Sequence, residues 1–221
     1  MSHKIITWDL ETSPQPDKVR EYNEYDPTTI KYGNTKDEEK RATIATAHEA
    51  KFWEEKLDKA ALNAPTLNII AVGLMIDDTP VMHTGDEKDL ITLMLDLYMG
   101  IKSGDVNASY LVGFNIFGFD LKILFQRAII LGIDIPAGMI NGRYYDSIFR
   151  DMMVEWSRYG YQEFIGLTRL AKILGVAQPR EHGIQGKDFH KVLASDPDKA
   201  EQYAFDDLKE CHAIAKRLIQ N

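Results

Sequence analysis

Two kinds of segment alternate along this chain: short runs rich in apolar and β-branched residues, and longer runs with apolar residues at helical spacing. This order is expected when a sheet is covered by helices, so it predicts an α/β domain. The expected strands cover residues 4–8, 67–75, 81–84 and 110–114, with a weaker strand or helix start over 144–149. The turn-forming residues 77–80 predict an antiparallel hairpin between the second and third of these strands.

Helices are predicted over residues 37–62, 86–99, 120–131, 167–174 and 187–193, and in a last helix that begins at Pro197. The start of this last helix is the best marked, because Ser195 and Asp196 are capping residues and Pro197 suits the first turn. About fifty residues, 14–65, separate the first two strands, which is long for a simple connection. We therefore expect one domain, 1–221, that carries an insertion over about 14–65.

Composition excludes several classes of protein. With 34 acidic and 26 basic residues the net charge is −8, which argues against binding nucleic acid by broad electrostatic attraction. A single cysteine, Cys211, cannot form an intrachain disulfide or a cysteine-rich zinc site, and it fits a reducing cytosol. No apolar stretch approaches the ~20 residues of a membrane span, and the amino terminus does not resemble a signal peptide. We expect a soluble, cytoplasmic protein.

Two short patterns place polar groups together. Asp9 and Glu11 stand two residues apart at the end of the first predicted strand, so their carboxylates point to the same face. Tyr203 and Asp207 stand four apart in the last predicted helix, so they share one of its faces. Each spacing is common by chance. A solvated strand end, and a tyrosine packed on the core, remain open alternatives on the spacing alone.

A rarer pattern lies in the segment Gly-Phe-Asn-Ile-Phe-Gly-Phe-Asp over residues 113–120. Asn115 is followed, after three residues, by Phe119 and Asp120. Chance predicts fewer than about 0.1 occurrences of this pattern in a chain of this composition. The alternative interpretation is an asparagine turn followed by an aspartate near a helix start.

Together these patterns resemble the DnaQ-like, ribonuclease-H-like 3′–5′ exonucleases of the four-carboxylate class, in the subgroup that uses a tyrosine (DEDDy). The likeness is greatest to the exonuclease domain attached to family B DNA polymerases, and it spans nearly the whole chain. It is carried by Asp9-Leu10-Glu11-Thr12, by Asn115 with Phe119-Asp120, and by Tyr203 with Asp207. A sister subgroup has a histidine five residues before the last aspartate, a spacing that no histidine here has. The resemblance implies a central mixed five-stranded sheet flanked by helices.

The resemblance also implies a mechanism. Two divalent cations, Mg²⁺ or Mn²⁺, would support hydrolysis of the terminal phosphodiester of single-stranded DNA, with release of nucleoside 5′-monophosphates. By this resemblance Asp9 bridges both ions, Glu11 and Asp207 complete the site that activates water, and Asp120 supports the second ion. Tyr203 would orient the attacking water, since a phenol hydroxyl both donates and accepts hydrogen bonds.

Substrate contacts follow from the same resemblance. The main chain at Leu10 and Thr12 would meet the terminal nucleotide, while Asn115 and Phe119 would position its sugar and base; Phe119 can equally belong to the core. The cations considered as phosphate contacts, each also interpretable as an ordinary surface charge, are Arg143, Lys172, Arg180 and Lys187. The expected partner is a DNA 3′ end, with replication or repair proteins as further candidates, and no membrane.

Two alternatives remain open. An RNA 3′-trimming exonuclease would share every ligand and differ only in accepting the 2′-OH. A ribonuclease-H-like nucleic-acid-binding module without catalysis would share the fold but need no metal.

Overall fold

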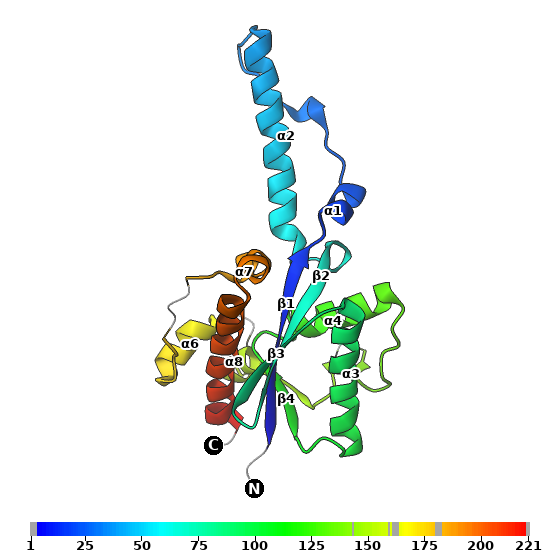
Figure 1. Cartoon of the computed structure of the whole chain (residues 1–221), viewed down its shortest axis with the longest axis vertical. Coiled ribbons are helices and arrows are strands. Elements are labelled where there is room, and N and C mark those ends of the chain that lie inside the picture. Colours follow the sequence, from blue (N-terminus) through cyan, green and yellow to red (C-terminus); the bar gives the residue numbers. More distant parts are fainter. Residues whose placement is uncertain (1–3, 143, 159, 161–163, 180–182, 220–221) are drawn as a thin grey trace. The chain divides into compact units, whose positions relative to one another are not determined.

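The computed structural model describes residues 4–142, 144–158, 160, 164–179 and 183–219. A five-stranded sheet has the strand order β3-β2-β1-β4-β7. Its strands are β1 (Ile5–Pro14), β2 (Leu67–Ile76), β3 (Thr79–Thr84), β4 (Tyr110–Gly113) and β7 (Phe149–Asp151) (Figure 1). Strand β4 runs parallel to β1 and to β7, whereas β2 and β3 are antiparallel. The predicted mixed, five-stranded α/β sheet is confirmed.

The antiparallel β2–β3 hairpin is also confirmed. The backbone angles of its two turn residues are those of a tight hairpin turn. Asp77 and Asp78 have φ angles of 47° and 64°, in the left-handed region. A two-residue hairpin turn of type I′ needs positive φ at both central positions, and aspartate tolerates that conformation better than most residues.

Helices flank the sheet (Figure 1). The helices along the chain are α1 (Pro16–Tyr22), α2 (Glu38–Ala60), α3 (Glu87–Ser103), α4 (Asp120–Leu131), α5 (Met152–Trp156), α6 (Leu167–Leu174), α7 (Phe189–Ser195) and α8 (Pro197–Ile219). Of these, α1 and α2 belong to the segment between β1 and β2, and the helices from α3 onward accompany the sheet. Short 3₁₀ turns are η1 (Pro27–Thr29), η2 (Ala64–Thr66) and η3 (Gly186–Asp188), and β5 (Ile140–Asn141) pairs with β6 (Tyr144–Tyr145). Helix α8 begins where predicted, and the Asp196 carboxylate accepts from Lys199 N at 3.2 Å.

The two faces of the sheet carry different helices. Helix α8 packs against β3 and β4, together with α5, α6 and α7, whereas α3 packs against α4. Trp8 and Phe149 are 6.4 Å apart by ring centroid, and Phe149 stacks on Tyr98 of α3. Thr7 points the other way, because its Oγ1 lies 2.7 Å from Nδ1 of His212 on α8. Side chains along β1 therefore alternate between the α3 face and the α8 face.

The chain forms two compact units, Met1–Thr12 with Ile69–Asn221, and Ser13–Asn68. The predicted insertion, 14–65, lies within the bounds of the second unit, which holds α1 and α2. Its two ends meet, because Gln15 N donates to the Thr66 carbonyl at 2.8 Å. A single domain with an insertion stays a prediction.

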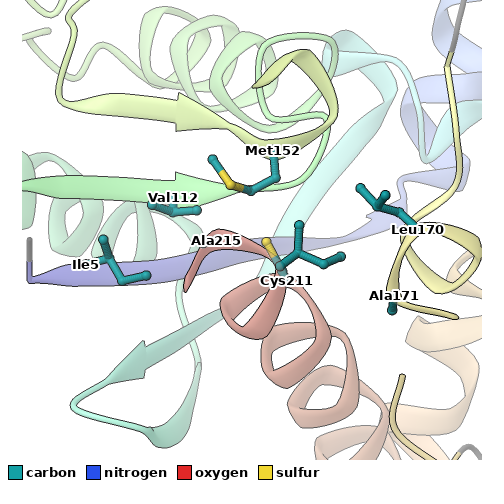
Figure 2. Packing of buried hydrophobic residues seen from close by; sticks show 8 residues of the cluster. Ile5, Val112, Met152, Leu170, Ala171, Cys211 and Ala215 are labelled. Atoms are coloured by element: carbon teal, nitrogen blue, oxygen red, sulfur yellow. The ribbon is translucent and has the colours of Figure 1, made fainter. Parts of the chain in front are cut away.

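One part of the core lies between the sheet and α8. Figure 2 shows this cluster, in which side chains of β1 and β4 meet side chains of α5, α6 and α8. The residues labelled there are Ile5, Val112, Met152, Leu170, Ala171, Cys211 and Ala215. Among the described residues, no helix is both long and apolar enough to cross a membrane.

Candidate active site

Asp9 and Glu11 lie inside β1 and not at its end, which corrects the sequence-based boundary. The strand continues to Pro14, and Glu11 is buried with 8% of its surface exposed. The prediction ended the strand at residue 8 because acidic residues usually mark exposed positions. Strand β1 is an interior strand between β2 and β4. Strand β4 pairs with Ile5–Thr7, and beyond that pairing the Asp120 side chain accepts from the Leu10 N–H, so the strand continues past its acidic residues. Thr7 faces α8, and the two-residue period therefore turns Asp9 and Glu11 to that same side.

The segment between β4 and α4 is shaped by close packing at two glycines. A Cβ on Gly113 would lie 2.2 Å from Ile116 Cγ2, and one on Gly118 would lie 2.4 Å from Asn115 Oδ1. Asn115 itself is left-handed, with φ of 61°. Its carbonyl accepts from the N–H groups of Gly118 and Phe119, so the segment forms a tight turn that delivers Asp120 to the start of α4.

Asp120 is held against β1. Its side chain is only 3% exposed, and its Oδ1 accepts a hydrogen bond from Leu10 N at 3.1 Å. Burial raises the pKa of Asp120 to about 7, the negative charge of Asp151 acts in the same direction, and the bond from Leu10 opposes the rise. The parallel pairing of β1 with β4 thus places Asp120 next to the strand that carries Asp9 and Glu11.

Tyr203 and Asp207 share one face of α8, as their spacing predicts. The Tyr203 hydroxyl hydrogen-bonds the Asp207 carboxylate, and burial together with nearby carboxylates raises the Tyr203 pKa far above its ordinary value. Neighbouring Asp206 points elsewhere and accepts from Gln202 Nε2 at 2.7 Å. Gly186 of η3 lies against the tyrosine, since a Cβ there would be 3.3 Å from the Tyr203 hydroxyl oxygen.

The four predicted carboxylates form one electrostatic cluster. Burial raises the pKa of Asp9 well above its usual range, and the charges of Asp120 and Asp207 add to the rise. Burial likewise raises the pKa of Glu11, followed by the charges of Asp9, Asp207 and Asp120. Side chains from β1, α4 and α8 therefore act on one another through a poorly hydrated space.

This cluster has the donor chemistry of a divalent-cation site. Its oxygen-only donors suit Mg²⁺ or Mn²⁺, and a cation would offset the repulsion that raises the carboxylate pKa values. In the part of the chain that the structure describes, however, no three His, Cys, Asp or Glu side chains are arranged to hold a metal ion.

The predicted substrate contacts differ in how accessible they are. The Leu10 side chain is buried and its N–H is engaged by Asp120, whereas Thr12, Asn115 and Phe119 are half-buried. Phe119 immediately precedes α4. The cations Lys172 and Lys187 are exposed, and Lys187 follows Gly186 beside the tyrosine. Arg143 and Arg180 lie outside the described residues.

The sequence-based prediction missed Asp151, which anchors the segment leading to Asp120. Asp151 is 1% exposed and accepts from the N–H groups of Asn115 and Phe117, both at 2.9 Å. It also caps α5, accepting from Met153 N at 3.0 Å and Val154 N at 3.4 Å. An aspartate directly before the apolar run 152–156 is a capping signal that could have identified it.

A polar chain that runs from a buried threonine to an exposed aspartate connects β1 with α8. Thr7 Oγ1 contacts His212 Nδ1 at 2.7 Å, and His212 Nε2 lies 3.2 Å from the Asp78 carboxylate, which also binds Lys216. Although threonine, histidine and aspartate are the groups of a nucleophilic triad, Thr7 is completely buried. Its role is structural: it links β1, the β2–β3 turn and α8.

Comparison with known proteins supports the fold. No protein-family model matches the sequence, and no curated protein sequence matches it. Among solved structures, it is similar to the family B DNA polymerase from the hyperthermophilic archaeon Pyrobaculum calidifontis, with a TM-score of 0.60. Sequence identity is 16%, over 99% of this chain and 25% of that polymerase, so the chain spans about a quarter of its length. The likeness shows a shared fold.

Proposed function

We propose that this chain is a ribonuclease-H-like, metal-dependent 3′–5′ exonuclease that acts on single-stranded DNA and releases nucleoside 5′-monophosphates. The observation that carries the proposal is the cluster in which burial, and then the charges of Asp120 and Asp207, raise the pKa values of Asp9 and Glu11 beside the Tyr203 hydroxyl. The fold shared with a family B DNA polymerase supports a nucleic-acid substrate.

Each side chain has a role that its surroundings favour. Bound divalent cations would supply an activated water and neutralise the charge that develops on the phosphate. Asp9 and Glu11 on β1, Asp120 on α4 and Asp207 on α8 are the groups that would hold them. Tyr203 is a neutral phenol at neutral pH, and burial with the nearby carboxylates raises its pKa further, so it remains neutral in alkaline solution as well. Its hydroxyl donates to Asp207, and its oxygen lone pairs can accept a hydrogen bond from water and so orient that water.

The proposal is tested by comparing Asp207→Asn with Asp206→Asn. Both changes remove one carboxylate from the same turn of α8, but only Asp207 hydrogen-bonds Tyr203. Degradation of a 5′-labelled single-stranded oligonucleotide in Mg²⁺ should fall about 100-fold or more in Asp207→Asn, and in Asp9→Asn, since each loses metal-dependent stabilisation of several kcal/mol. Asp206→Asn should stay within a few-fold of wild type.

Product analysis completes the experiment. A ladder that shortens one nucleotide at a time from the 3′ end, with nucleoside monophosphate released, is expected. DNA and RNA oligonucleotides of one sequence, tested side by side, identify the preferred sugar. A wild-type protein that degrades neither, with Mg²⁺ or Mn²⁺, would overturn the proposal and favour a binding module.

A further inference from the structure

A cavity of about 800 Å³ lies at the β7 edge of the sheet, outside the carboxylate cluster. Aromatic side chains are the largest group in its described lining: Phe117, Tyr144, Tyr145, Phe149 and Phe164. The volume falls in the range of about 300–1,000 Å³ that is usual for ligand pockets. Nothing in the proposed two-metal chemistry uses these rings.

The rings are arranged as a platform and a rim. Phe117 stacks on Tyr145 with ring centroids 5.3 Å apart and planes at 19°, so this pair is already ordered. Tyr144 and Phe164 are each 63% exposed, although large aromatic side chains are usually buried. Two aromatic rings at the mouth of an aromatic-lined cavity are suited to a flat partner that stacks.

The charged groups of the described lining are compensated within the protein. Arg150 Nε donates to Glu155 at 2.7 Å, and its guanidinium lies over the Tyr110 ring. Asp146 accepts from Lys102 at 2.9 Å and from the Tyr98 hydroxyl. A phosphate would have to compete with Glu155 for the charge of Arg150, whereas a neutral ring would leave both pairs undisturbed. The charge pattern therefore favours an uncharged aromatic ligand.

The cavity adjoins the segment that leads to the carboxylate cluster. Phe117 belongs to the turn between β4 and α4, three residues before Asp120, and its N–H is bound by Asp151. One wall of the cavity and one carboxylate of the candidate active site are thus parts of a single, tightly held turn.

We infer that this cavity binds a nucleobase of the single-stranded substrate, upstream of the nucleotide to be removed. The inference rests on the proposed function for the identity of the strand. Stacking is tolerant of sequence because every base has a π face, so the site would hold the strand without selecting a base. It would also let a protein of net charge −8 bind DNA with few cations.

Binding without cleavage tests the site independently of catalysis. Anisotropy of a fluorescein-labelled single-stranded oligonucleotide is measured in EDTA for wild type, Tyr144→Ala, Phe164→Ala and the control Ile129→Ala. Ile129 is a comparably exposed apolar residue, on α4, that does not line the cavity. Each aromatic variant should bind about five-fold or more weakly, the loss expected for one stacked base, with Ile129→Ala unchanged. Phe164→Trp, which keeps an aromatic ring at this position, should bind the oligonucleotide about as tightly as wild type.

An abasic scan of the oligonucleotide identifies the base. At one position upstream of the 3′ end, an abasic residue should weaken wild-type binding as much as Phe164→Ala does, and the two losses should not add. Additive losses at every position, or full affinity in both aromatic variants, would overturn the inference. If the wild-type protein degrades DNA in Mg²⁺ but the aromatic variants bind as tightly as wild type, the nucleobase site is wrong and the exonuclease proposal stands. The failure of one proposal is therefore distinguishable from the failure of the other.

Discussion

At the scale of one residue, the buried carboxyl of Asp120 lowers the stability of the folded protein when it is ionised. Its carboxyl is 3% exposed and has a pKa of about 7, whereas an ordinary aspartate has a value near 3.8. In the unfolded chain the group ionises near pH 4, but in the folded protein it keeps its proton until about pH 7. Ionising it at neutral pH therefore costs folding free energy unless a cation compensates.

The stability of the metal-free protein should therefore fall as pH rises. Because the folded-state pKa of Asp120 is raised, its contribution to stability is fully present below about pH 4, where both states hold the proton, and declines as pH rises to about 7, since the unfolded chain releases the proton first. Urea unfolding in EDTA at several pH values from 4.5 to 7.5 measures this slope. Asp120→Asn, which cannot ionise, should be stabilised relative to wild type at pH 7.5 by a few kcal/mol, with little difference at pH 4.5. A difference independent of pH would contradict the assignment.

At the scale of elements, the turn between β4 and α4 depends on a residue from a third element. Asp151 at the end of β7 binds the N–H groups of Asn115 and Phe117, and the same carboxylate caps α5. The bonds within the turn leave the N–H groups of Asn115 and Phe117 to be bound by Asp151, so a residue outside the turn helps to order it. Asp151 thereby helps to set the position of Asp120.

Mutation can distinguish the roles of the two carboxylate oxygens of Asp151. Oδ2 binds only Phe117 N, whereas Oδ1 serves Asn115 and the cap of α5. Asp151→Asn can keep the Oδ1 bonds while its amide faces Phe117 N–H, so it should lose about 1 kcal/mol of stability and about ten-fold in kcat, with the substrate KM little changed. Asp151→Ala should cost about 2–4 kcal/mol, because several buried N–H groups lose their acceptor. Equal effects of both variants on stability and kcat would indicate a purely structural role.

At the scale of the molecule, every candidate catalytic group belongs to the unit formed by Met1–Thr12 and Ile69–Asn221. The other unit, Ser13–Asn68, begins and ends at neighbouring backbone groups, Gln15 and Thr66. It orders its own aromatic residues, for example Tyr25 with Phe52 and with His48. The candidate catalytic residues and the insertion therefore belong to different compact units.

Replacing residues 17–64 by a short glycine-containing turn should leave the larger unit folded. Circular dichroism and urea unfolding should show one cooperative transition, and Asp207-dependent degradation of a short oligonucleotide should remain within about ten-fold of the full chain. A deletion variant with no cooperative transition would show that the insertion is part of the folding unit.

The sequence predicts most elements because they are locally encoded. Capping at Asp196 and the Asp77-Asp78 turn were readable in advance, as was the shared face of Tyr203 and Asp207. The extent of β1 was not, because burial between two strands overrides the polarity of Glu11. Strand β7 was also poorly predicted: it has only three residues, so a periodic pattern is absent.

The family resemblance predicts that the four carboxylates come together in the fold, whereas local sequence patterns do not. Asp120 reaches Leu10 only because β1 and β4 are parallel neighbours, a pairing between residues more than one hundred positions apart. The aromatic cavity has no sequence signature for the same reason. Phe117 and Phe164 are separated by several elements and become neighbours only through the sheet edge.

The single cysteine gives the protein a built-in reporter of breathing motions. Cys211 is 4% exposed in the layer between α8 and the sheet, and burial together with the nearby carboxylates raises its thiol pKa. Alkylating reagents react with the thiolate, so labelling in the native state requires α8 to separate from the strands. The labelling rate thus records how often the layer that holds Asp207 opens. A ligand that connects α8 to β1 should slow the alkylation of Cys211. Its binding can therefore be measured without a substrate or a chromophore.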